Sequence, residues 1–262
     1  MTAMEKQQAT PLVSVIMPAY NAAPFIEAAI ASVLAQTLTD WELIVIDDCS
    51  KDSTQKIIAE FAEKDARIHL VINEENMGVA KTRNRGLAMS RGKFVALLDS
   101  DDYWKPNMLE KMVARGEETG ADIIYCSYEL VNEQGQKVCN DFIVPAETTF
   151  RESIVRSVIT CSTVLVTSEL AKNHCFPTNM YHEDIALWFQ LLRDGAVARG
   201  VADVLASYRQ RANSRSGDKI ASACRRWTIY RKHLGMPLMQ SIGVMIRYAF
   251  LGVMKYKRVR SW

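Results

Sequence analysis

Three aspartates stand within four positions of the sequence, directly after an apolar run. Asp99, Asp101 and Asp102 follow the run 94–98. Like charges this close repel one another, so the cluster is favourable chiefly when a cation lies among them. Carboxylate oxygens suit Mn²⁺ or Mg²⁺, which proteins usually hold through one or two carboxylates together with substrate phosphates. The cluster predicts a metal site. A turn ahead of a helix that starts near Pro106 is the alternative for so short a motif.

A second group of residues predicts a site for a diphosphate. Asn76 and Gly78 precede an expected helix that contains Arg83. A glycine at a helix start lets backbone N–H groups approach an anion, and an arginine can bind phosphate oxygens through two parallel hydrogen bonds. Tyr20 ends an earlier apolar run and could stack on a base. A metal site beside a phosphate site indicates a nucleoside diphosphate as the ligand.

Apolar runs and amphipathic stretches alternate through residues 11–130 and predict strands and helices in turn. Such β–α units form a mostly parallel sheet covered by helices, and ligands bind at the carboxyl ends of its strands. Polar clusters follow three of the expected strands, so we expect the site at that edge of the sheet. The expected strands are 12–17, 43–46, 68–72, 94–98 and 123–130, and the expected helices are 24–36, 52–61, 78–90 and 108–115.

The periodicity is weaker in residues 131–218. Strands are expected at 136–143, 162–166, 197–201 and 204–208, and a helix at 183–193. From residue 219 a helical extension is expected, interrupted near Pro237. The composition, with 48% hydrophobic and 24% charged residues, excludes disorder and a coiled coil. The fold class is therefore α/β with a helical C-terminal extension.

The charge of the chain is distributed unevenly. The formal net charge is only +2, yet residues 219–262 contain ten of the 32 Lys and Arg and none of the 30 Asp and Glu. A basic segment beside an acidic body indicates an anionic partner, either a nucleic acid or a membrane surface. No nucleic acid is expected, because the segment has no recognisable nucleic-acid-binding motif and the rest of the chain is acidic.

Within this segment, an apolar stripe with helical spacing precedes a basic end. Basic residues beside an apolar face are typical of a helix that lies in the interface of an anionic membrane. The run 238–254 includes polar residues and is a poor candidate for a membrane span. The alternative is a helix that packs on the body or on a second copy of the chain in a homodimer. The stripe consists of Ile242, Met245, Ile246, Ala249, Phe250 and Val253, and the basic end of Lys255, Lys257, Arg258 and Arg260.

Nothing near the N-terminus indicates export. Residues 1–10 are polar, and the first apolar run, 12–17, is too short for a signal peptide. The six cysteines form no C-x-x-C pair. We therefore expect no zinc site and interpret the cysteines as reduced thiols of a cytoplasmic protein.

Taken together, the motifs resemble those of the family 2 glycosyltransferases, which have the GT-A fold and transfer sugars from nucleotide diphosphates. Their order and spacing fit across about residues 11–210. The motifs are VSVIMPAYN (13–21), SVLAQT (32–37), ELIVIDDCS (42–50), NMGVAKTRN (76–84), LDSDD (98–102) and ED (183–184). The processive Gln-x-x-Arg-Trp pattern is absent. The resemblance therefore implies a non-processive member, of the kind that builds bacterial surface polysaccharides.

For the nucleotide, the resemblance assigns roles to residues in the first motifs. It implies that Asp48 accepts a hydrogen bond from the ring N–H of uracil. It also implies that Tyr20 packs on the base, with Pro18 and Asn21 in the same segment. Asn76, Gly78 and Arg83 are implied at the diphosphate.

For the metal and the reaction, the resemblance points to the later motifs. It implies that Asp99 lies near the ribose or the metal, and that Asp101 binds the metal directly with help from Asp102. Asp184 resembles the general base of inverting members, although Glu183 and Asp184 could simply cap a helix.

One position departs from the family pattern. Relatives often carry a His in a Tyr-Arg-x-His-x-x-Ser segment, whereas residues 208–214 read YRQRANS, with Arg211 in the His place. An arginine cannot ligate a metal but can neutralise a departing diphosphate; the alternative is that Arg211 points to solvent.

The resemblance implies a complete function for the chain. It implies transfer of one sugar from a UDP-sugar, with Mn²⁺ or Mg²⁺, to a hydroxyl of a glycan or polyprenyl-diphosphate-linked glycan at the inner face of the cell membrane. Residues 11–218 form the predicted catalytic domain, with a nucleotide-binding half (11–130) and an acceptor half (131–218), and residues 219–262 form the extension.

Two other classes of protein fit the sequence less well. A dinucleotide-dependent oxidoreductase would carry a G-x-G-x-x-G motif after its first strand, and this chain lacks that motif there. A non-catalytic module does not account for the filled carboxylate positions.

Overall fold

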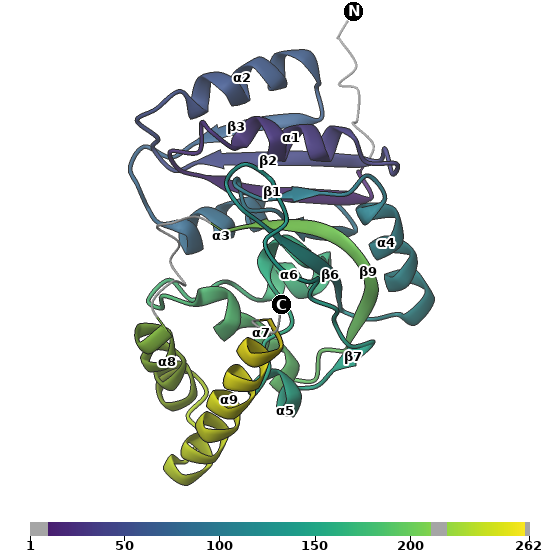
Figure 1. Cartoon of the computed structure of the whole chain (residues 1–262). Coiled ribbons are helices and arrows are strands. Elements are labelled where there is room, and N and C mark those ends of the chain that lie inside the picture. The colour runs from purple at the N-terminus through teal and green to yellow at the C-terminus, as the bar shows by residue number, and fades with distance from the viewer. Residues whose placement is uncertain (1–9, 211–218, 260–262) are drawn as a thin grey trace, which may run out of the picture.

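A computed structural model describes residues 10–210 and 219–259 of the chain. All strands in these ranges belong to one sheet, with the order β3-β2-β1-β4-β8-β6-β9-β5 and with β7 beside β9 (Figure 1). Strands β1 to β4 are parallel neighbours, as predicted, whereas β8, β5 and β7 run antiparallel to their partners, so the sheet as a whole is mixed. The strands are β1 (Val13–Ala19), β2 (Trp41–Asp47), β3 (Ile68–Ile72), β4 (Phe94–Leu97), β5 (Tyr103–Trp104), β6 (Ile123–Val131), β7 (Glu147–Thr148), β8 (Val164–Thr167) and β9 (Ala198–Arg209).

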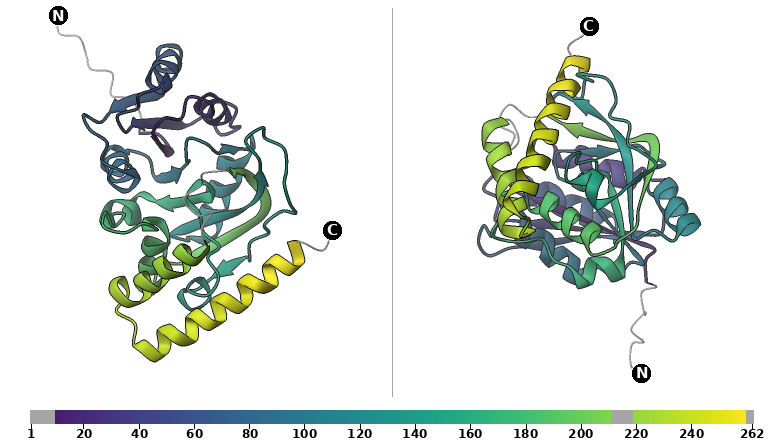
Figure 2. Two further views of the ribbon diagram at one scale, coloured as in Figure 1. Left: turned by 60° about the vertical axis from the view of Figure 1, so that its left-hand side comes forward. Right: turned by 90° about the horizontal axis from the view of Figure 1, so that it is seen from below.

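Helices cover both faces of the sheet. A 3₁₀ turn at Cys161–Thr163 precedes β8, and a π-helical turn at Ile229–His233 follows α8. Helices α8 and α9 lie at the end of the molecule away from α1 and α2 (Figures 1 and 2). No helix within 10–210 and 219–259 has the length and hydrophobicity of a membrane span. The helices are α1 (Ile26–Leu34), α2 (Thr54–Lys64), α3 (Val79–Met89), α4 (Met108–Thr119), α5 (Phe150–Ser153), α6 (Ser168–Asn173), α7 (Glu183–Arg193), α8 (Lys219–Thr228) and α9 (Leu238–Val259).

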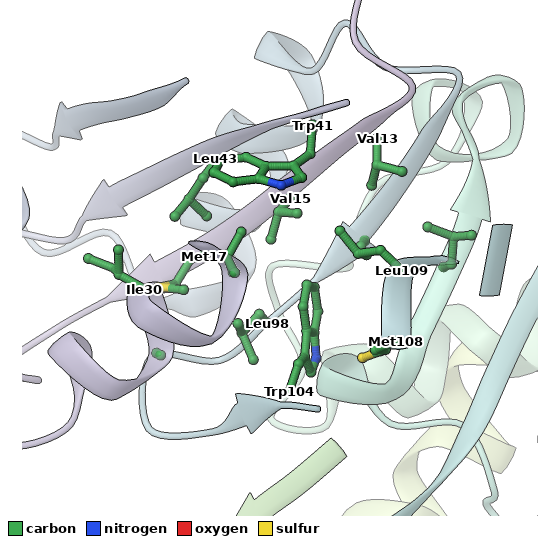
Figure 3. Close-up of a cluster of buried hydrophobic side chains, with 14 of the residues drawn as sticks. Val13, Val15, Met17, Ile30, Trp41, Leu43, Leu98, Trp104, Met108 and Leu109 are labelled. Carbon is green, nitrogen blue, oxygen red and sulfur yellow. The ribbon is translucent and has the colours of Figure 1, made fainter. Parts of the chain in front are cut away.

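Two apolar clusters hold the helices on the sheet. On one face, Met17 of β1 packs with Ile30 of α1 and Met108 of α4, and Figure 3 shows this cluster around Trp104. On the other face, residues of α3, α6 and α7 pack against the same strands. Because β1, β2 and β4 are buried on both faces, their sequences read as continuous apolar runs.

The second half of the chain differs from expectation in two places. Residues 136–143 form no strand; only isolated bridges join Val131 to Lys137 and Tyr128 to Phe142. The ranges 197–201 and 204–208 belong to the single strand β9, whose pairing with β6 shifts register beside Ser127. A local irregularity of this kind breaks the alternation of side chains along a strand, which explains why one strand looked like two. One sheet includes strands from both predicted halves. The assignment of nucleotide binding to one half and of acceptor binding to the other stays a prediction.

Glu42 ties the start of the sheet together and supports a stability prediction. This buried carboxylate accepts hydrogen bonds from Ser14 (2.6 Å) and from the side chain of Arg91 (2.9 Å). Burial alone would raise the pKa of Glu42, but the hydrogen bonds from Arg91 and Ser14 hold it below its ordinary value. A carboxylate with a lowered pKa stabilises the fold above its unfolded pKa of about 4.3, and this contribution is lost as the pH falls through the folded pKa.

We therefore expect Glu42→Gln to lower the free energy of unfolding by about 1–3 kcal/mol at neutral pH. The difference between wild type and variant should shrink as the pH falls below about 4. Urea unfolding of both proteins at neutral and acidic pH measures this difference in the free energy of unfolding. A difference that stays constant across this range would contradict the assigned charge of Glu42.

Candidate active site

Three polar segments meet at one edge of the sheet. Strands β1, β2 and β4 are parallel, with Ala19 opposite Asp47 and Ile16 opposite Leu97, so their carboxyl ends lie together. The residues that follow these strands are the ones that the sequence singled out, Tyr20, Asp48 and the turn 99–102. The edge of the sheet is therefore where a ligand of a parallel α/β fold is expected.

The segments after β1 and β2 hold one another in place. The backbone N–H of Asn21 donates to Ser50 Oγ (2.9 Å), and its Oδ1 accepts from the N–H of Lys51 (2.8 Å). Asn21 adopts a positive φ of 47°, which asparagine tolerates better than most residues. Pro18 is buried in β1 opposite Ile46, so it can only position its neighbours. Tyr20 is 50% exposed, which leaves its ring available for stacking on a base.

Asp48 organises the loop that leads into α3. Its Oδ1 accepts from Asn73 Nδ2 (2.7 Å) and the N–H of Met77 (2.9 Å), and its Oδ2 accepts from the N–H of Gly78 (2.8 Å). Asn76 Nδ2 donates to the carbonyl of Asp48 (3.3 Å). Gly78 has a φ of 81°, a conformation that favours glycine. The N–H of Gly78, predicted at the diphosphate, thus binds Asp48 instead, and Oδ2 of Asp48 keeps one acceptor position.

The three aspartates after β4 have different surroundings. Asp99 and Asp101 are partly exposed, whereas Asp102 is only 2% exposed. Asp102 accepts hydrogen bonds from Ser162 Oγ (2.5 Å) and the N–H of Arg209 (2.7 Å). Burial, followed by the charges of Asp101 and Asp99, raises the pKa of Asp102 well above its ordinary value. In the structure, the oxygens of Asp102 join the turn to the 3₁₀ turn and to β9. Its role as an assisting metal ligand stays a prediction.

The remaining two carboxylates fit a hard divalent cation. Among residues 10–210 and 219–259, no three His, Cys, Asp or Glu side chains converge on one metal position. Mn²⁺ and Mg²⁺ do not need such a cage, since they usually take one or two carboxylates and fill their other positions with phosphate and water. Asp99 and Asp101 offer this donor set, and the charges of both contribute to the raised pKa of Asp102.

Arg83 occupies a position that the sequence did not reveal. Its side chain is 5% exposed, and it donates to Glu183 Oε1 (2.8 Å) and to Asp99 Oδ1 (2.5 Å). Burial alone would lower the pKa of Arg83, but the nearby carboxylates, Asp99 first among them, hold it well above its ordinary value. In the structure, Arg83 is paired with two carboxylates and joins the turn after β4 to the start of α7. Its contact with phosphate stays a prediction.

Asp184 lies one residue beyond this junction, in the first turn of α7. Its charge is among those that raise the pKa of Arg83, so it faces the same group of carboxylates. The residue before the helix is His182, and no side chain caps α7. Asp184 is partly exposed and has no hydrogen-bond partner among the described residues. Both Glu183 and Asp184 lie in the first turn of α7, where the helix dipole favours acidic residues, so the capping alternative stays open beside the predicted role of Asp184 as a base.

Arg209 is a site residue that sequence reasoning missed. Its Nε donates to the carbonyl of Asp101 (2.8 Å), and its guanidinium also donates to the carbonyl of Glu133 (2.6 Å). The guanidinium lies over the rings of Phe25 (5.0 Å) and Tyr103 (5.5 Å). Arg209 therefore fixes the backbone of the aspartate turn from β9. The only signal was its place beside Tyr208 in the Tyr-Arg pattern. The neighbouring Arg211 lies outside the described residues.

We expect Arg209→Lys to weaken metal binding while the protein stays folded. A lysine has a single ammonium group and cannot donate to both carbonyls in the fixed geometry of a guanidinium. The Mn²⁺ concentration for half-maximal sugar transfer should rise about tenfold, the equivalent of about 1.4 kcal/mol. The control is Arg115→Lys, since Arg115 pairs with Glu118 on the surface of α4. An unchanged metal requirement would contradict the role of Arg209.

Comparisons with known proteins agree with this geometry. The family model described as glycosyl transferase family 2 matches residues 14–138. TuaG of Bacillus subtilis (strain 168), a glycosyltransferase named for teichuronic acid biosynthesis, is 36% identical over 245 residues, covering 94% of this chain and 97% of that protein. The chain is a family 2 glycosyltransferase. This confirms the family predicted from the motifs and excludes the oxidoreductase alternative.

A further relative and a solved structure are similar to this chain. WfgD of Escherichia coli, named as a UDP-Glc:alpha-D-GlcNAc-diphosphoundecaprenol beta-1,3-glucosyltransferase, is 35% identical over 246 residues, covering 94% of this chain and 95% of that enzyme. The crystal structure of S. aureus TarS 1–349 with UDP-GlcNAc superposes with a TM-score of 0.71 at 21% identity, covering 90% of this chain and 71% of that one. The similarity confirms the predicted GT-A fold of this family 2 glycosyltransferase.

Proposed function

We propose that this glycosyltransferase transfers one sugar from a UDP-sugar to a hydroxyl of a lipid-linked glycan, with inversion at the anomeric carbon. The buried Arg83 carries the proposal, because it joins Asp99 of the aspartate turn to Glu183, the neighbour of Asp184. Metal-binding carboxylates and a general base are thereby adjacent. The names of two relatives support the substrates, since WfgD is named for UDP-Glc and a GlcNAc-diphosphoundecaprenol acceptor, and TarS was crystallised with UDP-GlcNAc.

In this proposal, the residues after β1 and β2 bind the nucleotide. The exposed ring of Tyr20 stacks on uracil, and the remaining acceptor position of Asp48 takes the ring N–H. Pro18, Asn21, Asn76 and Gly78 hold these two residues in place. Asp99 would contact the ribose or the metal. Arg211 balances the charge of the leaving diphosphate.

The reaction is a single displacement. Asp184 takes the proton of the acceptor hydroxyl while that oxygen forms a bond to the anomeric carbon. The bond from this carbon to the diphosphate oxygen breaks on the opposite side, and its electron pair leaves with UDP. An α-linked donor therefore yields a β-glycoside. When bound by Asp99 and Asp101, Mn²⁺ or Mg²⁺ supplies positive charge against the diphosphate.

The proposal extends to the organisation of the chain. Residues 11–130 bind the nucleotide and residues 131–218 contribute to the acceptor site. The basic extension, residues 219–262, meets the anionic membrane from which a polyprenyl-diphosphate-linked acceptor is presented. The enzyme then works as a peripheral protein at the inner face of the cell membrane, with no nucleic acid partner.

A transfer assay with chelator tests the proposal. A panel of UDP- and GDP-sugars is offered with a GlcNAc-diphospholipid acceptor, first in excess EDTA and then after addition of Mn²⁺. We expect transfer from one UDP-sugar, only after the metal is added, and a β-linkage in the product. Transfer that persists in EDTA would contradict the metal, and transfer from GDP-sugars alone would contradict the donor.

A further inference from the structure

Helix α9 has two apolar faces, and only one of them packs on the protein. Val244 and Met245 pack against the cluster that contains Phe189 and Tyr230. Tyr248 lies beneath the guanidinium of Arg226 at 4.2 Å. These three residues are spaced as one face of a helix. All three are partly buried by this contact, whereas several other apolar residues of α9 are exposed.

The second face of α9 points outward. Met239, Ile246 and Phe250 are 78%, 65% and 64% exposed, and Leu238 and Ile242 are also exposed. Positions 239, 242, 246 and 250 follow one another at intervals of three or four residues, so they form one continuous strip. The single stripe predicted from the sequence is thus divided, since Met245 faces the protein and Ile242, Ile246 and Phe250 face outward. We call the five exposed residues of this face the outer strip: Leu238, Met239, Ile242, Ile246 and Phe250.

The outer strip is a concentration of exposed apolar surface. The other large apolar side chains exposed in the described residues are scattered over the sheet edges, loops and helix ends, for example Met89 and Val197. Scattered exposed apolar residues are ordinary, but contiguous ones mark a binding surface. The strip must therefore meet an apolar partner.

The charge around the strip identifies the partner. Residues 219–262 contain no acidic residue and ten Lys and Arg. Arg247 is exposed on α9, and Arg231 and Lys232 are exposed in the turn before it. An apolar strip in a segment that carries cations and no acidic residue matches the interface of an anionic bilayer, where apolar side chains enter the acyl boundary and cations meet phosphate headgroups. We propose that α9 lies in the plane of an anionic membrane with its outer strip inserted.

The segment that precedes α9 connects this surface to the active site. Phe189 of α7 stacks on Tyr230 at 6.3 Å, and Arg193 of α7 donates to the carbonyl of Leu234 (2.7 Å). Helix α7 carries Asp184 at its first turn. Binding of α9 to the membrane therefore fixes the orientation of α7, the helix that carries Asp184, relative to the membrane. This consequence rests on the proposed function, because only a lipid-linked acceptor requires it.

Vesicle co-sedimentation of the full chain tests the inference. The vesicles contain either phosphatidylcholine alone or equal parts of phosphatidylcholine and phosphatidylglycerol. The test variant is Ile246→Gln/Phe250→Gln, and the matched control is Met89→Gln/Val197→Gln, which removes two exposed apolar residues elsewhere. We expect wild type and control to bind the anionic vesicles only, and the test variant to bind at least tenfold more weakly. UDP binding measured by calorimetry should be equal in all three proteins.

Three results would overturn the inference. The first is a wild-type protein that does not bind anionic vesicles, and the second is a test variant that binds them as wild type does. The third is a wild-type dimer that the test variant converts to a monomer, because a second copy would then cover the strip. Failure of the proposed function is distinguishable, since it would remove UDP binding or transfer without changing vesicle binding.

Discussion

Asp101→Asn is expected to abolish metal-dependent sugar transfer and leave the fold intact. Asparagine keeps the size of the side chain but removes the charge that a divalent cation needs from this turn. The fold should tolerate the change, because Asp101 is partly exposed and its charge disfavours ionisation of the buried Asp102. We expect a loss of at least about 10³-fold in kcat/KM, as for other losses of a strong electrostatic contribution to a transition state.

The matched control for this prediction is Asp203→Asn. Asp203 is an exposed aspartate that pairs with Lys111 away from the site. Circular dichroism and thermal unfolding check that both variants fold. Near-normal turnover of Asp101→Asn in saturating Mn²⁺ would refute the assignment of Asp101 as the metal ligand.

Asp184→Asn is expected to impair the chemical step and to leave donor binding intact. Asp184 meets the acceptor and not the donor in this account, so UDP-sugar binding should survive. The rate at saturation, kcat, should fall by roughly 10²-fold or more, as for removal of a general base. Calorimetry with UDP and Mn²⁺, together with steady-state kinetics, separates binding from chemistry.

The control for Asp184 lies on the same helix. Asp194 follows the last residue of α7, is exposed and accepts from Gln190, so Asp194→Asn changes the same helix without touching the site. Its kinetics should match those of wild type. If Asp184→Asn instead lost donor binding and kept its rate at saturation, Asp184 would not be the base.

Sequence periodicity predicted the parts of the fold that are buried in a regular way. Strands β1 to β4 appear as apolar runs because helices cover both faces, and the predicted bounds of β3 and α7 agree with the structure. Residues 136–143 misled because their apolar positions include Val138 and Ile143, which are exposed in a loop. Their pattern resembles a strand, but the segment pairs with β6 only at isolated bridges, and periodicity does not report whether pairing is continuous.

Local sequence predicted where the site lies in the fold but not the contacts between residues distant in sequence. The clusters after β1, β2 and β4 were found because parallel strands end at one edge. The contacts of Asp102 and Arg83 were not predicted, since both are made with residues distant in sequence. Ser162 and Arg209 donate hydrogen bonds to Asp102, and Arg83 donates to Glu183. In a single sequence, three neighbouring aspartates look equivalent; only tertiary contacts distinguish them.

The buried side chain of Arg83 connects the aspartate turn after β4 to the start of α7. One guanidinium neutralises a carboxylate from the aspartate turn and another from the base helix, in surroundings where an unpaired charge would be costly. The two halves of the site are therefore held at a fixed separation by a single side chain. This explains how residues from β4 and α7, far apart in the sequence, can act on one substrate.

The crystal structure of the protein with UDP and Mn²⁺ tests the central claim most directly. The account predicts the uracil ring on Tyr20 and within hydrogen-bond distance of Asp48, with the diphosphate beside the turn 99–101 and Mn²⁺ on Asp101. UDP bound away from the carboxyl ends of β1, β2 and β4, or Mn²⁺ bound without contact to Asp99 or Asp101, would contradict it.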